Sequence, residues 1–132
     1  MISGSCCCGA VKFELRAAPA MMGTCHCTRC RKAGASTLVF VKREDLIWLQ
    51  GKEHVALYTP APPYKYGRCF CRFCGSSLGE ILSDAATFPI SAHALDTEFG
   101  LRNQFHEFTS EKPGWYEICD DAPQSTGHPS AS

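Results

Sequence analysis

The cysteines are the residues whose type and spacing most clearly indicate chemistry. Ten of the 132 residues are cysteines, and nine of them lie in three tight clusters: Cys6-Cys7-Cys8; Cys25, Cys27 and Cys30; and Cys69, Cys71 and Cys74. A disulfide-stabilised chain spreads its cysteines so that the bonds close loops. Thiolates separated by one or two residues can instead converge on one metal ion. The spacing therefore predicts metal binding rather than a disulfide scaffold.

Two of the clusters together predict a closed metal site. Cys71 and Cys74 have the spacing of a zinc knuckle, and Gly75 after them gives the turn the freedom to direct backbone N–H groups at the sulfurs. Cys6 and Cys8 would face the same way in a strand and could share one ion, while the residue between them points elsewhere. Four thiolates complete the coordination of a structural zinc. Such a site would connect the N-terminus to the middle of the chain.

The remaining cluster predicts a second and more reactive zinc site. Cys25, Cys27 and Cys30 offer three thiolates within six residues. If the first site is completed by its own four cysteines, the second has three protein ligands and one open position, as catalytic zinc sites do. A thiol that enters this position would lose its proton and become a nucleophile at neutral pH. The sequence thus predicts two Zn²⁺ per chain and a small thiol as substrate.

Other assignments of the same residues remain open at this stage. One is a single ribbon-type site that leaves the N-terminal cysteines unused and is formed by Cys25, Cys30, Cys71 and Cys74. In another, His26 is the fourth ligand of the second site, although its place between two ligands predicts that it points away. The other cysteines are expected to be small buried apolar residues: Cys7, Cys69 and Cys119.

Arginines accompany the cysteine clusters. Seven thiolates and two Zn²⁺ leave a net negative charge, which Arg29, Arg31 and Arg68 could balance. The guanidinium group also binds carboxylates through two parallel hydrogen bonds. Arg29 and Arg68 are therefore candidates for binding the carboxylates of a substrate.

The elements that position these residues are predicted to be short strands. Apolar residues recur mostly with a period of two, which is typical of strands with one buried face. The expected strands are 11–15, 37–41, 47–49, 55–58, 66–70, 78–82, 88–92, 104–109 and 115–118. A single short helix is expected to begin at Thr28, whose side chain can cap it, and to end near Gly34. Residues 1–124 then form one mainly β domain, and residues 125–132 are expected to be a disordered tail.

Charge and hydropathy exclude several classes of function. Thirteen basic and thirteen acidic residues give a formal net charge of zero, so no nucleic-acid footprint is expected. The longest apolar stretches are too short for a membrane span. The N-terminus lacks the basic start and apolar core of a signal peptide, which predicts a cytoplasmic protein.

Three segments carry a resemblance to a known family. Residues 4–14 (GSCCCGAVKFE), 25–34 (CHCTRCRKAG) and 68–78 (RCFCRFCGSSL) are similar to the glutathione-dependent formaldehyde-activating enzymes, or CENP-V/GFA domain. Residues 94–96 and 112–118 also look like the C-terminal half of that family, so the resemblance extends over about residues 3–124.

The resemblance implies a fold, two metal sites and a reaction. The fold would be the Mss4-like β-tent, which consists of short antiparallel strands held together by bound zinc. The structural zinc would be held by Cys6, Cys8, Cys71 and Cys74, and the catalytic zinc by Cys25, Cys27 and Cys30. The implied activity is that of a carbon–sulfur lyase that condenses glutathione with formaldehyde to S-(hydroxymethyl)glutathione, and a homo-oligomer is compatible with it.

Two other classes of function compete with this enzyme. In a binding module, both zinc ions would be structural and the concave face of the β-tent would hold a partner, since a fold does not decide a function. In a redox sensor or metal-handling protein, the thiolates between Cys25 and Cys30 would oxidise or exchange metal.

Overall fold

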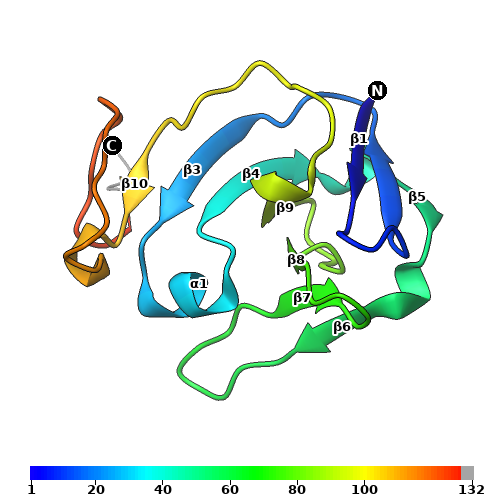
Figure 1. The fold of residues 1–132 in the computed structure, drawn as a ribbon, viewed down its shortest axis with the longest axis horizontal. Helices are drawn as coiled ribbons and strands as arrows, with labels where there is room; N and C mark the ends of the chain where they lie inside the picture. The colour runs from blue at the N-terminus through cyan, green and yellow to red at the C-terminus, as the bar shows by residue number, and fades with distance from the viewer. Residues whose placement is uncertain (129–132) are drawn as a thin grey trace.

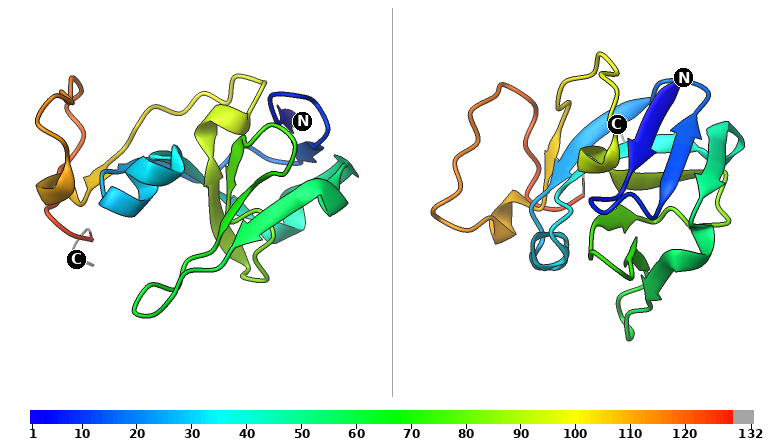
Figure 2. Two further views of the ribbon diagram at one scale, coloured as in Figure 1. Left: turned by 60° about the horizontal axis from the view of Figure 1, so that its bottom comes forward. Right: turned by 45° about the vertical axis from the view of Figure 1, so that its right-hand side comes forward.

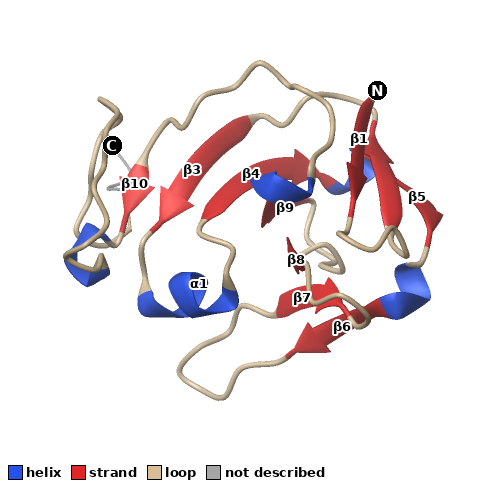
Figure 3. Cartoon of the chain, viewed as in Figure 1, coloured by secondary structure: helices blue, strands red, loops and turns tan. Residues whose placement is uncertain are grey.

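Short strands make up most of the regular structure (Figures 1 and 3). The computed structural model describes residues 1–128. Its strands are β1 (Ile2–Ser5), β2 (Lys12–Leu15), β3 (Met21–Cys25), β4 (Thr37–Lys42), β5 (Leu46–Gln50), β6 (Val55–Tyr58), β7 (Arg68–Cys71), β8 (Ser77–Gly79), β9 (Thr87–Ser91) and β10 (His106–Glu107). One α-helix, α1 (Thr28–Ala33), lies between β3 and β4. Single turns of 3₁₀ helix occur at Arg43–Asp45, Lys52–His54, Ala92–Ala94 and Thr109–Glu111.

The strands form three small sheets. Their orders are β1-β2-β5, β10-β3-β4-β9 and β6-β7-β8. All neighbouring strands are antiparallel except β10, which runs parallel to β3. The prediction of a mainly β fold of short antiparallel strands is confirmed. In Figure 1, α1 lies between the ends of β3 and β4 and the β6–β7 hairpin.

The sequence prediction missed β1 and β3, and both contain a glycine. Glycine normally weakens a strand, but here each glycine leaves room for an aromatic ring. A Cβ atom on Gly4 would lie 2.2 Å from the ring of Phe13, and a Cβ atom on Gly23 would lie 2.1 Å from the ring of Phe105. Packing across the sheet therefore outweighs the low strand propensity of these segments.

One predicted strand does not form. Residues 115–118 are irregular, and no strand in the described part of the chain pairs with them. Trp115, one of the apolar residues on which the prediction of this strand rests, is 76% exposed. A period-two pattern needs a neighbouring strand and a buried face, and this segment has neither.

The core lies where the three sheets meet. Alternate residues of β2 and β9 point into it, so Phe13, Leu15, Phe88 and Ile90 are fully buried. Each such side chain stabilises the fold by about 1.5–3 kcal/mol through burial of apolar surface. Cys6 and Cys71 are buried in the same cluster, so the core reaches two of the predicted metal ligands.

The C-terminal part of the chain covers the free edge of β3, far from the β1–β2 hairpin (Figures 1 and 2). Residues 125–128 belong to the predicted tail, yet Ser125 and Gly127 make backbone hydrogen bonds to residues 106–109. Residues 129–132 of that tail lie outside the described residues. The boundary between domain and tail stays a prediction. Among the described residues, no helix has the length and apolar character needed to cross a membrane.

Candidate metal centres

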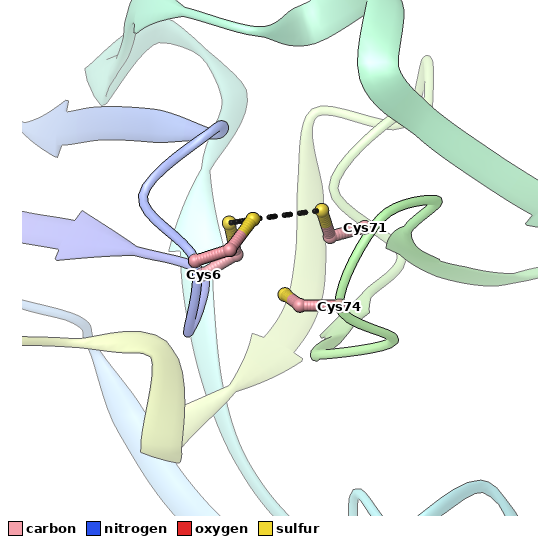
Figure 4. Close-up of side chains that lie close together, drawn as sticks. Cys6, Cys71 and Cys74 are labelled. Atoms are coloured by element: carbon pink, nitrogen blue, oxygen red, sulfur yellow. Dashed lines mark hydrogen bonds between the residues drawn. The ribbon is translucent and has the colours of Figure 1, made fainter.

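Four cysteines from two distant parts of the chain converge at one point. Cys6 and Cys8 lie in the turn between β1 and β2, while Cys71 ends β7 and Cys74 lies in the turn that follows it. Their sulfurs all lie within 4.8 Å of one another. Figure 4 shows the side chains of Cys6, Cys71 and Cys74 pointing toward a common space. We call these four residues the four-cysteine cluster.

The geometry of the four-cysteine cluster fits a tetrahedral zinc ion. Zn–S bonds of about 2.3 Å at tetrahedral angles imply sulfurs roughly 3.8 Å apart. The Cys6 and Cys8 sulfurs are 3.7 Å apart, and those of Cys8 and Cys71 are 3.8 Å apart. A disulfide would need a separation of about 2.05 Å. The donor atoms and their spacing therefore suit one zinc ion.

Backbone N–H groups support the sulfurs of this cluster, as the knuckle-like spacing predicts. The Val11 N–H donates to Cys6 Sγ at 3.3 Å, and the Phe73 N–H donates to Cys71 Sγ at 3.4 Å. Gly75 takes a positive φ of 76° in the same turn. Hydrogen bonds from the Ser76 hydroxyl and backbone lower the pKa of Cys74 to about 5. These hydrogen bonds therefore favour the thiolate form of Cys74 at neutral pH even without a bound cation.

The arrangement of Cys6 and Cys8 differs from the predicted one. The sequence places them in a strand, whereas the structure places them in a turn. Cys7, at the tip of that turn, is exposed, as is Cys119 in an irregular segment, so the prediction that both are buried is wrong. Cys69 is 2% exposed and lies in the core, as predicted.

Three further cysteines form a second cluster, which we call the cysteine triad. Cys25 ends β3, Cys27 precedes α1, and Cys30 lies within the helix. Their sulfurs also lie within 4.8 Å of one another. Cys25 and Cys30 are each 5% exposed, whereas Cys27 is only partly buried. Cys71 and Cys74 join Cys6 and Cys8 rather than this triad, contrary to the ribbon alternative.

Local helix capping holds the triad together. The sequence predicts that Thr28 caps α1, but the capping residue is Cys27, whose sulfur accepts from the Cys30 N–H at 3.2 Å. Gly34 ends the helix with a φ of 72°, as expected for a glycine at this position. Glu111 accepts from both the N–H and the hydroxyl of Thr28, at 3.1 and 3.0 Å.

Arg68 gives the triad a partly buried positive charge. Its Nη1 donates to Cys30 Sγ at 3.2 Å, while its Nε is buried with no hydrogen-bond partner among the described residues. Hydrogen bonding with the Cys25 thiol and then with Arg68 lowers the pKa of Cys30 to about 5, and the same sharing raises the pKa of Cys25. The triad therefore also contains one thiolate that is ready to bind a cation.

Arg29, near the start of the helix, is partly exposed. Its guanidinium carbon is 3.9 Å from the centre of the Tyr64 ring, and its Nη2 donates to the Tyr58 hydroxyl at 3.4 Å. Within residues 1–128, no carboxylate lies within 4.0 Å of the Arg29 nitrogens. Arg29 is thus oriented by aromatic rings and can still bind an external anion.

His26 does not join either cluster in the described part of the chain. Its Nε2 lies 2.7 Å from His106 Nδ1, and burial lowers its pKa. This agrees with the expectation that it points away from the thiols. His106, Glu111 and Asp120, which contact this region, were missed because no short-range spacing connects them to the cysteine motifs.

An open cavity of about 430 Å³ adjoins the four-cysteine cluster. Its lining includes Cys7, Ser76, His93 and Asp96, but no residue of the triad. A much smaller cavity of about 30 Å³ lies beside Arg68. Neither cavity reaches the triad, in which Cys27 is the one cysteine that is not buried and so the member most accessible from solvent.

Comparison with known proteins identifies the family. The model of the glutathione-dependent formaldehyde-activating enzyme family matches residues 1–111. A protein of Halomonas elongata named "putative glutathione-dependent formaldehyde-activating enzyme" is 27% identical over 89% of this chain and 81% of its own length. The crystal structure of a Rhodobacter sphaeroides protein superposes with a TM-score of 0.58 and 27% identity, over 76% of this chain and 90% of that one. The chain belongs to the glutathione-dependent formaldehyde-activating enzyme family.

Proposed function

We propose that this protein is a zinc-dependent enzyme of the carbon–sulfur lyase type, which forms S-(hydroxymethyl)glutathione from glutathione and formaldehyde. The observation that carries the proposal is the difference between the two clusters. One has four converging thiols, and the other has three, one of which is partly exposed. Family membership supports the choice of thiol and aldehyde.

The proposed metal ligands follow from this difference. Cys6, Cys8, Cys71 and Cys74 would hold a structural zinc, and Cys25, Cys27 and Cys30 would hold a second zinc. When bound to the triad, zinc would supply an electrophilic centre that favours the thiolate form of an incoming thiol. Arg68, which donates to Cys30, would balance part of the negative charge of the three sulfurs.

The reaction itself requires one new bond. The glutathione sulfur adds to the carbonyl carbon of formaldehyde, the C=O double bond becomes a C–O single bond, and the thiol proton ends on the oxygen. The chain's contribution would be to hold the two reactants in contact, because fixing their geometry removes much of the entropic barrier. Arg29 would bind a glutathione carboxylate and orient the tripeptide, since Tyr58 and Tyr64 hold its guanidinium in place.

The test is the rate of exchange between free glutathione and its formaldehyde adduct, measured by two-dimensional exchange NMR. The zinc-loaded protein is expected to accelerate the exchange above the spontaneous rate. Arg29→Met should raise the KM for glutathione by about 10- to 100-fold, since a hydrogen bond to a charged group is worth about 1.5–3 kcal/mol. The same variant should handle β-mercaptoethanol as the wild type does, because that thiol has no carboxylate for Arg29 to bind.

The matched control is Arg31→Met, which removes an exposed arginine from the same helix. It is expected to behave like the wild type toward both thiols. An exchange rate equal to the spontaneous rate would reject the proposed reaction. If glutathione also fails to change the visible spectrum of cobalt-substituted protein, a binding module becomes the better account.

A further inference from the structure

Two buried imidazoles and one surface carboxylate form a hydrogen-bonded chain beside the cysteine triad. His26 Nε2 is 2.7 Å from His106 Nδ1, and His106 Nε2 is 2.9 Å from Asp120 Oδ1. The histidines are 5% and 3% exposed, whereas the Asp120 side chain is 44% exposed. The chain therefore runs from the residue between Cys25 and Cys27 to the surface.

The carboxylate sets the direction of these hydrogen bonds. An ionised carboxylate only accepts, so His106 Nε2–H donates to Asp120. In a neutral His106 ring, Nδ1 is then the acceptor, and His26 Nε2–H donates to it. Asp120 is itself held by the Ala122 N–H at 3.0 Å and by Asn103 Nδ2 at 3.4 Å. The surface carboxylate thus favours one tautomer and orientation of both rings, and the Asn103 side-chain amide, whose Nδ2 is 3.0 Å from His106 Nε2, packs at the same place.

The main chain at His26 is held by the same part of the fold. The His26 N–H donates to the Glu107 carbonyl at 2.9 Å, and the Thr24 N–H donates to the Phe105 carbonyl at 2.9 Å. The segment Cys25–Cys27 is thus fixed on one side by β10 through its backbone. The hydrogen bond to His106 fixes the side chain of His26, the central residue of this segment. The Tyr116 and His26 rings pack in an edge-type arrangement, with ring centres 5.4 Å apart.

We propose that Asp120 and His106 are positioning residues for the cysteine triad, and that they act by holding His26 so that the thiols on either side of it stay convergent. This inference rests on the proposed function, because it takes the triad to be a metal site. The match to the family model ends at residue 111, so Asp120 lies beyond the part of the chain that the family match describes. Groups that orient metal ligands from outside the coordination sphere typically change metal affinity 10–100-fold when removed.

The test measures Co²⁺ affinity at both clusters by competition with a chelator, followed through the thiolate-to-cobalt absorption. Asp120→Ala is expected to weaken Co²⁺ binding at the triad by 10–100-fold. The four-cysteine cluster should keep its wild-type affinity and spectrum, which shows in the same sample that the variant is folded. Asp120→Asn keeps an oxygen that can accept from His106 and should restore most of the affinity.

Asp121→Ala is the matched control, because it removes the adjacent exposed carboxylate, which forms no side-chain hydrogen bond within the described part of the chain. It should match the wild type. Nitrogen-15 NMR of the rings gives a second readout: Nε2–H for both histidines in the wild type, and loss of that single tautomer in Asp120→Ala.

The outcomes separate the two proposals. Equal triad affinity in Asp120→Ala and the wild type would overturn the positioning role and leave the proposed function intact. A wild-type triad that binds no Co²⁺ would instead overturn the proposed function, and the positioning role would fall with it.

Discussion

Replacing Cys71 with serine is expected to unfold the protein at room temperature. Cys71 is fully buried in the core and also belongs to the four-cysteine cluster, so its loss removes a metal ligand and leaves a polar group in its place. Binding of a structural zinc contributes roughly 10–16 kcal/mol in small zinc domains. The whole stability of a domain is about 5–15 kcal/mol. Far-ultraviolet circular dichroism and zinc content would measure the result.

Cys69→Ser provides the matched control for this variant. Cys69 lies on the same strand, is 2% exposed, and belongs to neither cluster. Its replacement is expected to lower the free energy of unfolding by about 1–3 kcal/mol, because a hydroxyl is buried, while the zinc content stays unchanged. A Cys71→Ser protein that stays folded and keeps its full zinc content would contradict the structural role of the cluster.

Replacing Cys27 with serine is expected to abolish catalysis without unfolding the protein. Cys27 caps α1 by accepting from the Cys30 N–H, and a serine oxygen is a preferred group for that position, so the helix should persist. The triad would retain only two thiols. The exchange between glutathione and its formaldehyde adduct should fall to the spontaneous rate, while the thermal unfolding midpoint stays close to the wild-type value.

The corresponding control is Cys7→Ser, which changes an exposed cysteine outside both clusters. It should keep the wild-type exchange rate. If Cys27→Ser also keeps the wild-type rate, the triad is not the site of the reaction. If Cys27→Ser unfolds, the triad is required for the fold, as a binding module with two structural zinc ions requires.

The four-cysteine cluster joins two of the three sheets. Cys6 and Cys8 belong to the turn of the β1-β2-β5 sheet, and Cys71 and Cys74 belong to the end of the β6-β7-β8 sheet. A chain of this size buries a modest core. A metal held between two small sheets would therefore add stability where apolar burial is limited.

The cysteine grouping was predictable because it is a local property. One or two residues between thiols limit their separation whatever the surrounding fold, so the spacing indicated which neighbouring sulfurs converge. It did not decide whether Cys71 and Cys74 join Cys6 and Cys8 or join Cys25 and Cys30, because that choice depends on contacts between distant segments. The strands with clear alternation, such as β2 and β9, were predictable for the same reason, because Phe13 and Leu15 or Phe88 and Ile90 share a face.

The remaining features depend on contacts between distant residues. Gly4 and Gly23 favour strands here only because Phe13 and Phe105 pack over them. The hydrogen bond between His26 and His106 joins residues 80 positions apart, and no motif marks it. Cys7 was predicted to be buried as an isolated small apolar residue, but the tip of a turn leaves it exposed.

The most direct test of the central claim is the number of zinc ions per chain in protein purified without chelators. Mass spectrometry under native conditions, together with elemental analysis, would count them. Four thiols at one point and three at another predict two zinc ions in the wild type and one in Cys27→Ser. A single zinc ion in the wild type, held by the four-cysteine cluster, would contradict the account, because the triad would then hold no metal at which a thiol could react.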